Sequence, residues 1–310
     1  MASSPYRVLK VEEKAHDDGV WCVSWRGQRI VTGAACATGR VKTWNVSAGA
    51  AFALTAGTPV AGADFPLAVV AVTQQPDGAA FAAGSLDGTL LVFDPAAGPD
   101  AAPRALPADP GCAWGAAFSP AGGPLLAATG QGGTVCVYNT AEGRRTQTLR
   151  SAAKCCTSLA WSATGRLLAA GGTDGTATVF DAVGGRRLLS IPAHAKPVRA
   201  VRFSGDGTML VTAGDDGCIN VRDVEKGALV ASITGHESWV CALDTCARAP
   251  RTLVSGGADG TVRLWDLSVN AHVHTFSEHH GQCWGVALND DATMVASVAD
   301  DKSLVVSSLV

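Results

Sequence analysis

Three histidines in the second half of the chain are each followed, 22 or 23 residues later, by an aspartate in a predicted tight turn. In a nucleophilic triad, a carboxylate orients the imidazole that activates a serine or cysteine. Two of the turn aspartates also follow a second aspartate, and paired carboxylates can divide general acid and base roles. The candidates for chemistry are therefore the pairs His194 with Asp216, His236 with Asp259 and His279 with Asp301, and the dipeptides 215–216 and 300–301.

The surrounding sequence does not complete a catalytic or metal site. The chain has no Gly-x-Ser-x-Gly elbow, no phosphate loop ending in Gly-Lys-Ser/Thr, no His-Glu-x-x-His and no EF-hand loop. No nucleophile is spaced with the paired aspartates. His272 and His274 alternate on a predicted strand, and His280 follows His279, but neither set has further candidate ligands, so solvated side chains are the preferred interpretation. The prediction is a protein without catalytic, cofactor-binding or metal-binding residues.

The elements that position these residues form a repeat. The stretch from His236 to Asp266 has a Gly-His pair, two runs with strand-like alternation, an Ala-Asp-Gly turn and a run that ends in Trp-Asp. The same pattern recurs seven times along the chain. The residues that end successive units, called here the closing positions, are 42 to 49 residues apart, a period typical of four strands per unit. The closing positions are Trp44, Phe93, Tyr138, Phe180, Arg222, Trp265 and Ser307.

This unit resembles the WD repeat, in which a Gly-His pair opens and a Trp-Asp pair ends one blade of a β-propeller. The resemblance implies that His236, Ser255, Asp259 and Trp265 form a hydrogen-bonded structural tetrad, which makes the His–Asp pair a structural element of the blade. The fifth unit keeps His194, Thr212 and Asp216, and the seventh keeps His279, Ser297 and Asp301. The first unit keeps His16, but Thr38 replaces its turn acid. Units two to four lack the histidine and are expected to depend mainly on packing.

Seven units occupy the chain, so the predicted fold is an all-β, seven-bladed WD-repeat β-propeller formed by one domain over residues 1–310. Only Leu309 and Val310 follow Ser308, so the seventh unit has room for three strands and no fourth. The alternating run at about residues 6–11 is predicted to pair with that blade and to close the ring, which removes an exposed sheet edge. The second unit departs from the pattern, because its segment 54–67 is longer than its counterparts and lacks the histidine.

Composition indicates in which cellular environment the protein occurs and which classes of partner it is expected to bind. The formal net charge is −3 and basic residues are scattered, with the pairs at 144–145 and 186–187 in predicted turns, so no direct nucleic-acid binding is expected. None of the ten cysteines forms a Cys-x-x-Cys pair, which favours buried, reduced thiols. No leader is apparent, and the uncharged segment 43–63 contains Gly and Pro and is mostly Ala and Thr, so no membrane span is expected.

A partner-binding face follows from the resemblance. In WD-repeat proteins the residue five after the opening His and the residue before the turn Asp line the face where partners dock. In this sequence the matching and neighbouring positions hold Trp21, Trp114, Arg199, Asp215, Trp239, Cys241, Trp284 and Asp300. Trp21, Trp114 and Trp284 are predicted to be exposed interface anchors, because tryptophan is enriched in such positions. The alternative is that they pack inside the sheets, as Trp25 and Trp161 are expected to do.

A narrower resemblance, to the WD-repeat subunits of the superkiller complex, covers nearly the whole chain. It is carried by AHDDGVWCVSW near the start, AWGAAFSP at 113–120, LVTAGDDGCINVRDV at 210–224, GHESWVCAL at 235–243, and HVHTF with QCWGVAL at 272–288. It implies a scaffold, monomeric by itself, that joins a helicase and a tetratricopeptide protein to feed RNA to the cytoplasmic exosome.

The same resemblance implies a nuclear role in the Paf transcription complex, so cytoplasmic and nuclear locations are expected. Two alternatives stay open. One is a generic WD-repeat adaptor in a ciliary or ubiquitin-ligase assembly, which only its partners would distinguish. The other is a propeller hydrolase, which would need acids that converge at the central channel.

Overall fold

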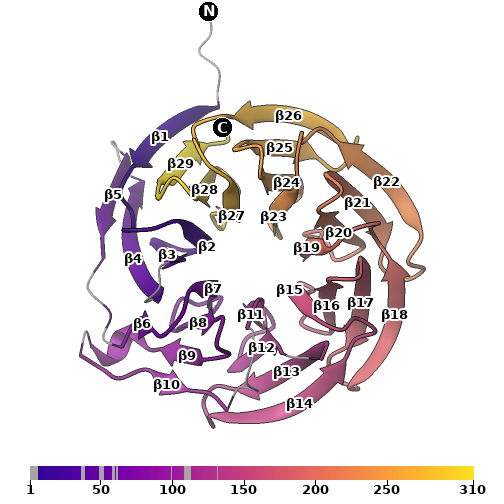
Figure 1. Ribbon diagram of the computed structural model, residues 1–310, viewed down its shortest axis with the longest axis horizontal. Coiled ribbons are helices and arrows are strands. Elements are labelled where there is room, and N and C mark those ends of the chain that lie inside the picture. Colours follow the sequence, from indigo (N-terminus) through magenta and orange to yellow (C-terminus); the bar gives the residue numbers. More distant parts are fainter. Residues whose placement is uncertain are drawn as a thin grey trace, which may run out of the picture.

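Seven antiparallel sheets stand as blades around a central channel (Figure 1). The computed structural model describes residues 6–35, 39–48, 52–57, 60, 62–98, 100–107, 113–130 and 132–310. Apart from one short 3-10 helix, Pro95–Ala97, the regular elements of this part of the chain are strands. The predicted seven-bladed β-propeller is confirmed.

Each blade runs from an inner strand at the channel to an outer strand at the rim. Blade 1 consists of β2 (Val20–Arg26), β3 (Arg29–Ala34), β4 (Gly39–Ala48) and β5 (Phe52–Ala56). Blade 2 consists of β7 (Val69–Gln74), β8 (Phe81–Ser85), β9 (Leu90–Phe93) and β10 (Arg104–Ala105). Blade 3 consists of β11 (Ala116–Phe118), β12 (Leu125–Thr129), β13 (Thr134–Asn139) and β14 (Arg144–Arg150). Blade 4 consists of β15 (Cys156–Trp161), β16 (Leu167–Gly172), β17 (Thr176–Asp181) and β18 (Arg186–Pro192).

The last three blades repeat this plan. Blade 5 consists of β19 (Val198–Phe203), β20 (Met209–Gly214), β21 (Cys218–Asp223) and β22 (Leu229–Thr234). Blade 6 consists of β23 (Val240–Cys246), β24 (Ala249–Gly257), β25 (Val262–Asp266) and β26 (Ala271–Phe276). Blade 7 consists of β27 (Cys283–Leu288), β28 (Met294–Ala299), β29 (Leu304–Ser308) and, from the other end of the chain, β1 (Arg7–Glu12).

The ring is closed by the pairing of β1 with β29. The two strands are antiparallel, from Arg7 opposite Ser308 to Glu12 opposite Leu304, with a register shift between Val8 and Lys10. β1 is the outer strand of blade 7, so this blade is built from both ends of the chain, as predicted. Its backbone groups satisfy the edge of β29, which would otherwise be open to another strand.

The hydrophobic core is divided among the contacts between neighbouring blades. Trp25 and Trp44 of blade 1 pack with Val298 and Leu304 of blade 7, across the seam where the ring closes. Comparable clusters lie between the other neighbours, for example Val135 of blade 3 against Leu159 of blade 4. Because each sheet buries apolar side chains on both faces, a blade depends on its neighbours for much of its burial.

Blade 2 departs from the repeat, as expected, and the structure shows how. A two-residue strand, β6 (Asp64–Phe65), pairs with β4 of blade 1, and the outer strand β10 is also only two residues long. Phe65 stands four residues before Val69, as His16 stands four before Val20, and its side chain is 2% exposed. An apolar ring therefore takes the place of the blade-opening histidine. Residues 58, 59 and 61 of the long segment lie outside the described part.

Two further expectations can be compared with the structure. The arginine pairs at 144–145 and 186–187 were predicted in turns, and this prediction is wrong: they begin the outer strands β14 and β18. The preceding turns, 140–143 and 182–185, are complete before the arginines. Much of the uncharged segment 43–63 lies in β4 and β5, and the described residues contain no helix long and apolar enough to cross a membrane.

Candidate protein-interaction site at the channel mouth

The His–Asp pair of blade 6 belongs to a continuous series of hydrogen bonds that runs from Trp265 to Asp259. His236 Nδ1 lies 2.9 Å from a carboxylate oxygen of Asp259, and its Nε2 lies 2.7 Å from Ser255 Oγ. The indole N–H of Trp265 donates to the same Ser255 oxygen over 2.8 Å. With the Nδ1-protonated tautomer, indole, hydroxyl and imidazole each donate to the next group and Asp259 accepts last. Every buried polar group in this chain is satisfied.

The chain has the connectivity of a Ser-His-Asp triad but not its accessibility. Ser255 is 0% exposed, and the Trp265 indole already donates to its hydroxyl oxygen. A substrate carbonyl cannot approach this oxygen without unfolding the blade. Burial disfavours ionisation of Asp259, but the hydrogen bonds from His236 and Thr261 outweigh it and hold the pKa of Asp259 well below its ordinary value. This network therefore acts as a structural link between strands.

Blades 5 and 7 contain shortened versions of the chain. His194 lies 2.9 Å from Asp216 and 2.9 Å from Thr212, while Arg222 replaces the tryptophan. His279 lies 2.8 Å from Ser297 and 3.2 Å from Asp301. The turn acids are therefore engaged by histidines, and the preceding acids Asp215 and Asp300 face other partners.

Blade 1 has a variant that sequence reasoning did not recognise. His16 Nε2 lies 2.8 Å from Thr32 Oγ1, which also accepts from the Trp44 indole over 2.9 Å. The turn position, Thr38, lies outside the described residues. Nearby, the ammonium of Lys42 donates to the Ala15 carbonyl. Burial, reinforced by the positive charge of Lys42, lowers the pKa of His16 to about 3.

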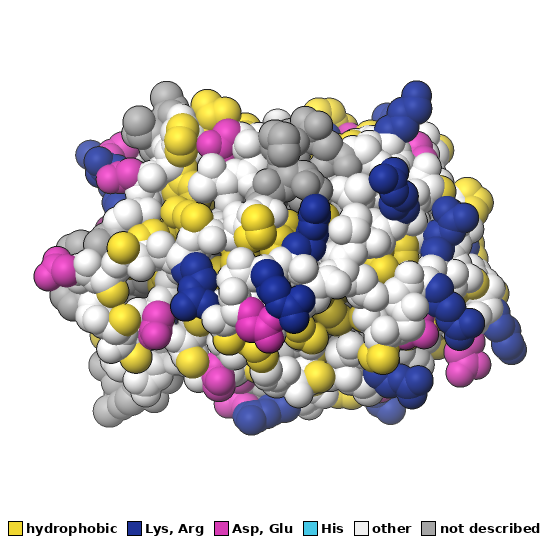
Figure 2. Space-filling model, turned by 90° about the horizontal axis from the view of Figure 1, so that it is seen from below, with side chains coloured by type: hydrophobic (Ala, Val, Ile, Leu, Met, Phe, Trp, Pro, Cys, Tyr) yellow, Lys and Arg dark blue, Asp and Glu magenta, His cyan; other side chains and the backbone are white. Residues whose placement is uncertain are grey.

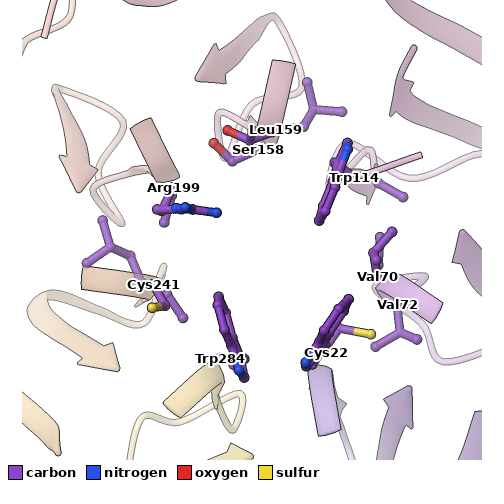
Figure 3. A pocket seen from close by; sticks show the side chains of 18 of the residues that line it. Cys22, Val70, Val72, Trp114, Ser158, Leu159, Arg199, Cys241 and Trp284 are labelled. Carbon is purple, nitrogen blue, oxygen red and sulfur yellow. The ribbon is translucent and has the colours of Figure 1, made fainter. Parts of the chain in front are cut away.

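A cavity of about 400 Å³ opens at one end of the channel, between the inner strands. Figure 3 shows Trp114, Trp284 and Arg199 pointing toward this space from different blades. Of the eight predicted partner-binding residues, five line it: Trp21, Trp114, Arg199, Cys241 and Trp284. The three tryptophans are half-buried and line the cavity. Burial raises the pKa of the Cys241 thiol to about 12, so this lining thiol is neutral at pH 7.

Asp300 orients two of the tryptophans. The indole N–H groups of Trp284 and Trp21 both donate to its Oδ1, over 2.8 and 3.3 Å. The two rings lie 5.9 Å apart at 51°, a tilted arrangement favoured between aromatic rings. Asp300 does not line the cavity itself but holds the side chains that do.

Asp215 has the corresponding role for Arg199. The guanidinium donates from Nε and Nη2 to the two carboxylate oxygens, over 2.6 and 2.9 Å. It also lies 5.3 Å from the centroid of Trp239, within the range of a cation–π contact. Trp239 is 39% exposed and flanks the cavity without lining it. The structure thus brings all eight predicted residues to one mouth, five as lining and three at its border.

Sequence reasoning missed the contributions of blades 2 and 4, which include Val70, Thr157 and Leu159. The prediction located partner-binding positions five residues after the opening histidine of each blade. Blades 2 and 4 lack this histidine, so their positions could not be located in this way. The first residue of the inner strand is a better reference, since Val70 follows Val69 and Thr157 follows Cys156 as Trp21 follows Val20. Trp25 and Trp161, both predicted inside the sheets, border a second cavity at the opposite mouth. Trp25 is buried, and Trp161 is half-buried and packs against the core between blades 3 and 4.

The eight cysteines in the described residues are free thiols, and these residues contain no group of His, Cys, Asp and Glu arranged to hold a metal ion. The model of the family "WD domain, G-beta repeat" matches residues 5–45, 63–94, 143–181, 185–223, 227–266 and 270–306, more than half of the chain. The chain belongs to the WD-repeat family. WD-repeat propellers generally bind protein partners, so a pocket ringed by tryptophans fits this family.

Two WD-repeat relatives show how far the likeness extends. The chain is similar to "WD repeat-containing protein VIP3" of Arabidopsis thaliana, 34% identical over 173 residues, which is 50% of each chain. It is also similar to "U3 small nucleolar RNA-associated protein 12" of Saccharomyces cerevisiae, 44% identical over 39 residues, 13% of this chain and 4% of that protein. The chain therefore matches half or less of the length of these relatives.

Proposed function

We propose that this WD-repeat propeller is a non-catalytic scaffold that binds a short segment of a larger protein at the mouth formed by Trp21, Trp114, Trp284 and Arg199, called here the aromatic mouth. The observation that carries the proposal is the cavity of about 400 Å³ that these side chains surround. Central tryptophans in desolvated pockets are the residues that most often dominate binding energy.

The aromatic mouth is preorganised for binding. Asp300 holds the indoles of Trp21 and Trp284, and Asp215 holds Arg199, before any partner arrives. Side chains that are already ordered lose little conformational entropy on association. Two of the five N–H groups of Arg199 reach Asp215, so others remain for a peptide carbonyl while an apolar side chain of the peptide enters the cavity.

The resemblance to the superkiller subunits supports a more specific proposal. By that likeness, the partner segment belongs to a tetratricopeptide scaffold that also holds a helicase, and in the nucleus the propeller joins the Paf complex. The proposed locations are accordingly the cytoplasm and the nucleus. The proposed role does not include catalysis, because the serines of the Ser-His-Asp chains in blades 6 and 7 are both buried.

Affinity purification of the tagged protein from its own cells tests the identity of the partners. Tetratricopeptide, helicase or Paf subunits in the eluate would support the specific proposal. Subunits of a ciliary or ubiquitin-ligase assembly in their place would contradict it and support the generic adaptor.

Calorimetry with the captured partner tests the site. Trp21→Ala, Trp114→Ala and Trp284→Ala are each expected to weaken binding by at least about thirtyfold, the typical effect of losing an interface anchor. The matched control is Trp161→Ala, which removes a half-buried tryptophan at the opposite mouth. All variants should be compared with the parent by thermal melting. Parent-like affinity in all three folded mouth variants would show that the partner binds elsewhere.

A further inference from the structure

Basic residues are in local excess on blades 3 and 4, although the net charge of the whole chain is close to zero. Residues 140–197 contain eight Lys and Arg but only three Asp and Glu, in a chain whose formal net charge is −3. All eight basic side chains are exposed: Arg144, Arg145, Arg150, Lys154, Arg166, Arg186, Arg187 and Lys196. Figure 2 shows Lys and Arg at the centre and along the right of the visible face, with fewer on the left. Basic residues are therefore more frequent on this part of the surface than in the chain as a whole.

The fold places the two arginine pairs at equivalent positions of adjacent outer strands. Arg144 and Arg145 begin β14, and Arg186 and Arg187 begin β18. In the orientation that gives both amide atoms of Gln147 a partner, the side-chain nitrogen donates to Ala182 O over 3.0 Å. The side-chain oxygen accepts from Gly185 N over 3.2 Å. This side chain of β14 thus fixes the turn that leads directly into Arg186. The turns and strand starts that carry the two pairs are therefore in direct contact.

Acidic side chains neutralise only part of this charge. Arg144 pairs with Glu142, and Arg186 lies 3.5 Å from Asp181. Arg187 has no acidic partner among the described residues. The guanidinium of Arg104 in β10 adds a further positive charge next to Arg144, since its Nη1 donates to the main-chain carbonyls of Thr140 and Ala141 in the preceding turn.

Exposed apolar side chains adjoin these arginines. Val183, in the turn before β18, is 79% exposed, and Leu188, directly after the arginine pair, is 42% exposed. We propose that this surface, called here the basic rim and defined by Arg104, Arg144, Val183, Arg186, Arg187 and Leu188, binds an acidic protein segment that also carries apolar side chains.

The apolar residues favour a protein over a nucleic acid as the occupant. Contacts to a phosphate backbone depend on charge, whereas Val183 and Leu188 can contribute only to an occupant with apolar groups of its own. Arginine forms bidentate hydrogen bonds with carboxylates, and these bonds suit Asp and Glu side chains. The basic rim is formed by outer strands and the aromatic mouth by inner ones, so one propeller can hold two segments at once.

The test measures binding of a labelled synthetic peptide in which Asp and Glu alternate with Leu, using fluorescence anisotropy at physiological ionic strength. The double variant Arg186→Glu/Arg187→Glu is expected to bind at least about tenfold more weakly, because like charges now face the peptide. The matched control is Lys226→Glu/Arg251→Glu, which changes the net charge equally at exposed positions outside the basic rim. The control should bind like the parent. Leu188→Ser should also weaken binding.

Three results would overturn the proposal. The first is a parent protein that does not bind the peptide. The second is equal loss of affinity in the basic-rim variant and the control, which would indicate non-specific attraction. The third is binding of a poly(U) oligonucleotide, lost in Arg186→Glu/Arg187→Glu but unaffected by Leu188→Ser, without binding of the peptide, which would identify the rim as a nucleic-acid surface.

Discussion

Trp21 of the first inner strand and Trp284 of the last inner strand lie against each other, with ring centroids 5.9 Å apart. One residue is near the beginning of the chain and the other near its end, so this contact forms only when blade 7 meets blade 1. Their indoles share one acceptor, Asp300. Closure of the propeller therefore also completes the aromatic mouth.

Asp300→Ala is expected to disorder the pair without unfolding the protein. The two indole N–H groups lose their common acceptor, while the rings remain at a solvent-accessible mouth where water can replace it. The near-UV circular dichroism of the tryptophans should decrease, and affinity for the partner segment should fall by about tenfold. Asp300→Asn is the control, because it keeps a carbonyl oxygen. Unchanged near-UV dichroism in Asp300→Ala would contradict this role of Asp300.

Asp259→Ala is expected to destabilise the protein more than the equivalent Asp87→Ala. Removal of the Asp259 carboxylate leaves the buried His236 with only the longer contact of 3.3 Å to Thr261 Oγ1, and a poorly satisfied buried group costs about 1–3 kcal/mol. Asp87 accepts from the backbone and hydroxyl groups of Thr89. Blade 2 has Phe65 in place of the histidine, so no imidazole loses a partner there. Urea denaturation at pH 7 measures both changes, and equal losses would refute the tetrad assignment.

Deletion of residues 1–12 is expected to lower the melting temperature and to promote aggregation. The deletion removes β1, leaves blade 7 with three strands and exposes the edge of β29. The control is deletion of residues 1–5, which leaves β1 intact. Differential scanning fluorimetry and light scattering provide the measurements. A monomeric 1–12 deletion with the parent melting temperature would show that β1 is dispensable for closure.

His16 is expected to make the stability depend on pH in mildly acidic solution. Its pKa is about 3 in the folded protein, below the ordinary value of 6.5, so the unfolded chain binds a proton between these values and the folded chain does not. Stability should therefore fall as the pH decreases below about 6.5, with a loss of about 2 kcal/mol between pH 7 and pH 5.

The matched variant His16→Gln tests that assignment, because it keeps a polar group near Thr32 but does not titrate. The free energy of unfolding, measured in urea at both pH values, should change by about 2 kcal/mol less in the variant than in the parent. The turn acid Asp259 does not contribute in this window, since its lowered pKa affects stability only below the ordinary value of 3.8. The same pH dependence in both proteins would exclude His16 as its source.

Local features explain why some of the site was predictable. The residues of the blade 6 chain lie on neighbouring strands of one repeat, so their spacing in the sequence reflects their distance in space. Positions that depend on a changed repeat were predicted less well. Phe65 took the place of a histidine without a recognisable motif. The arginine pairs follow strand-closing positions and were predicted in turns, but the turns at 140–143 and 182–185 end before them.

The sequence by itself determined the number of blades and the polar chain of each well-formed repeat, because a blade is a local unit whose turns and strand pairings involve neighbouring segments. The closing strand β1 pairs across the whole length of the chain, and it was predictable because the seventh unit has residues for only three strands. Only the tertiary structure decided which side chains from different blades meet. Trp21 and Trp284 share Asp300, Arg199 lies against Trp239, and β14 supports the turn before Arg186. These contacts depend on the twist and spacing of adjacent sheets around the ring, a geometry that no single repeat encodes.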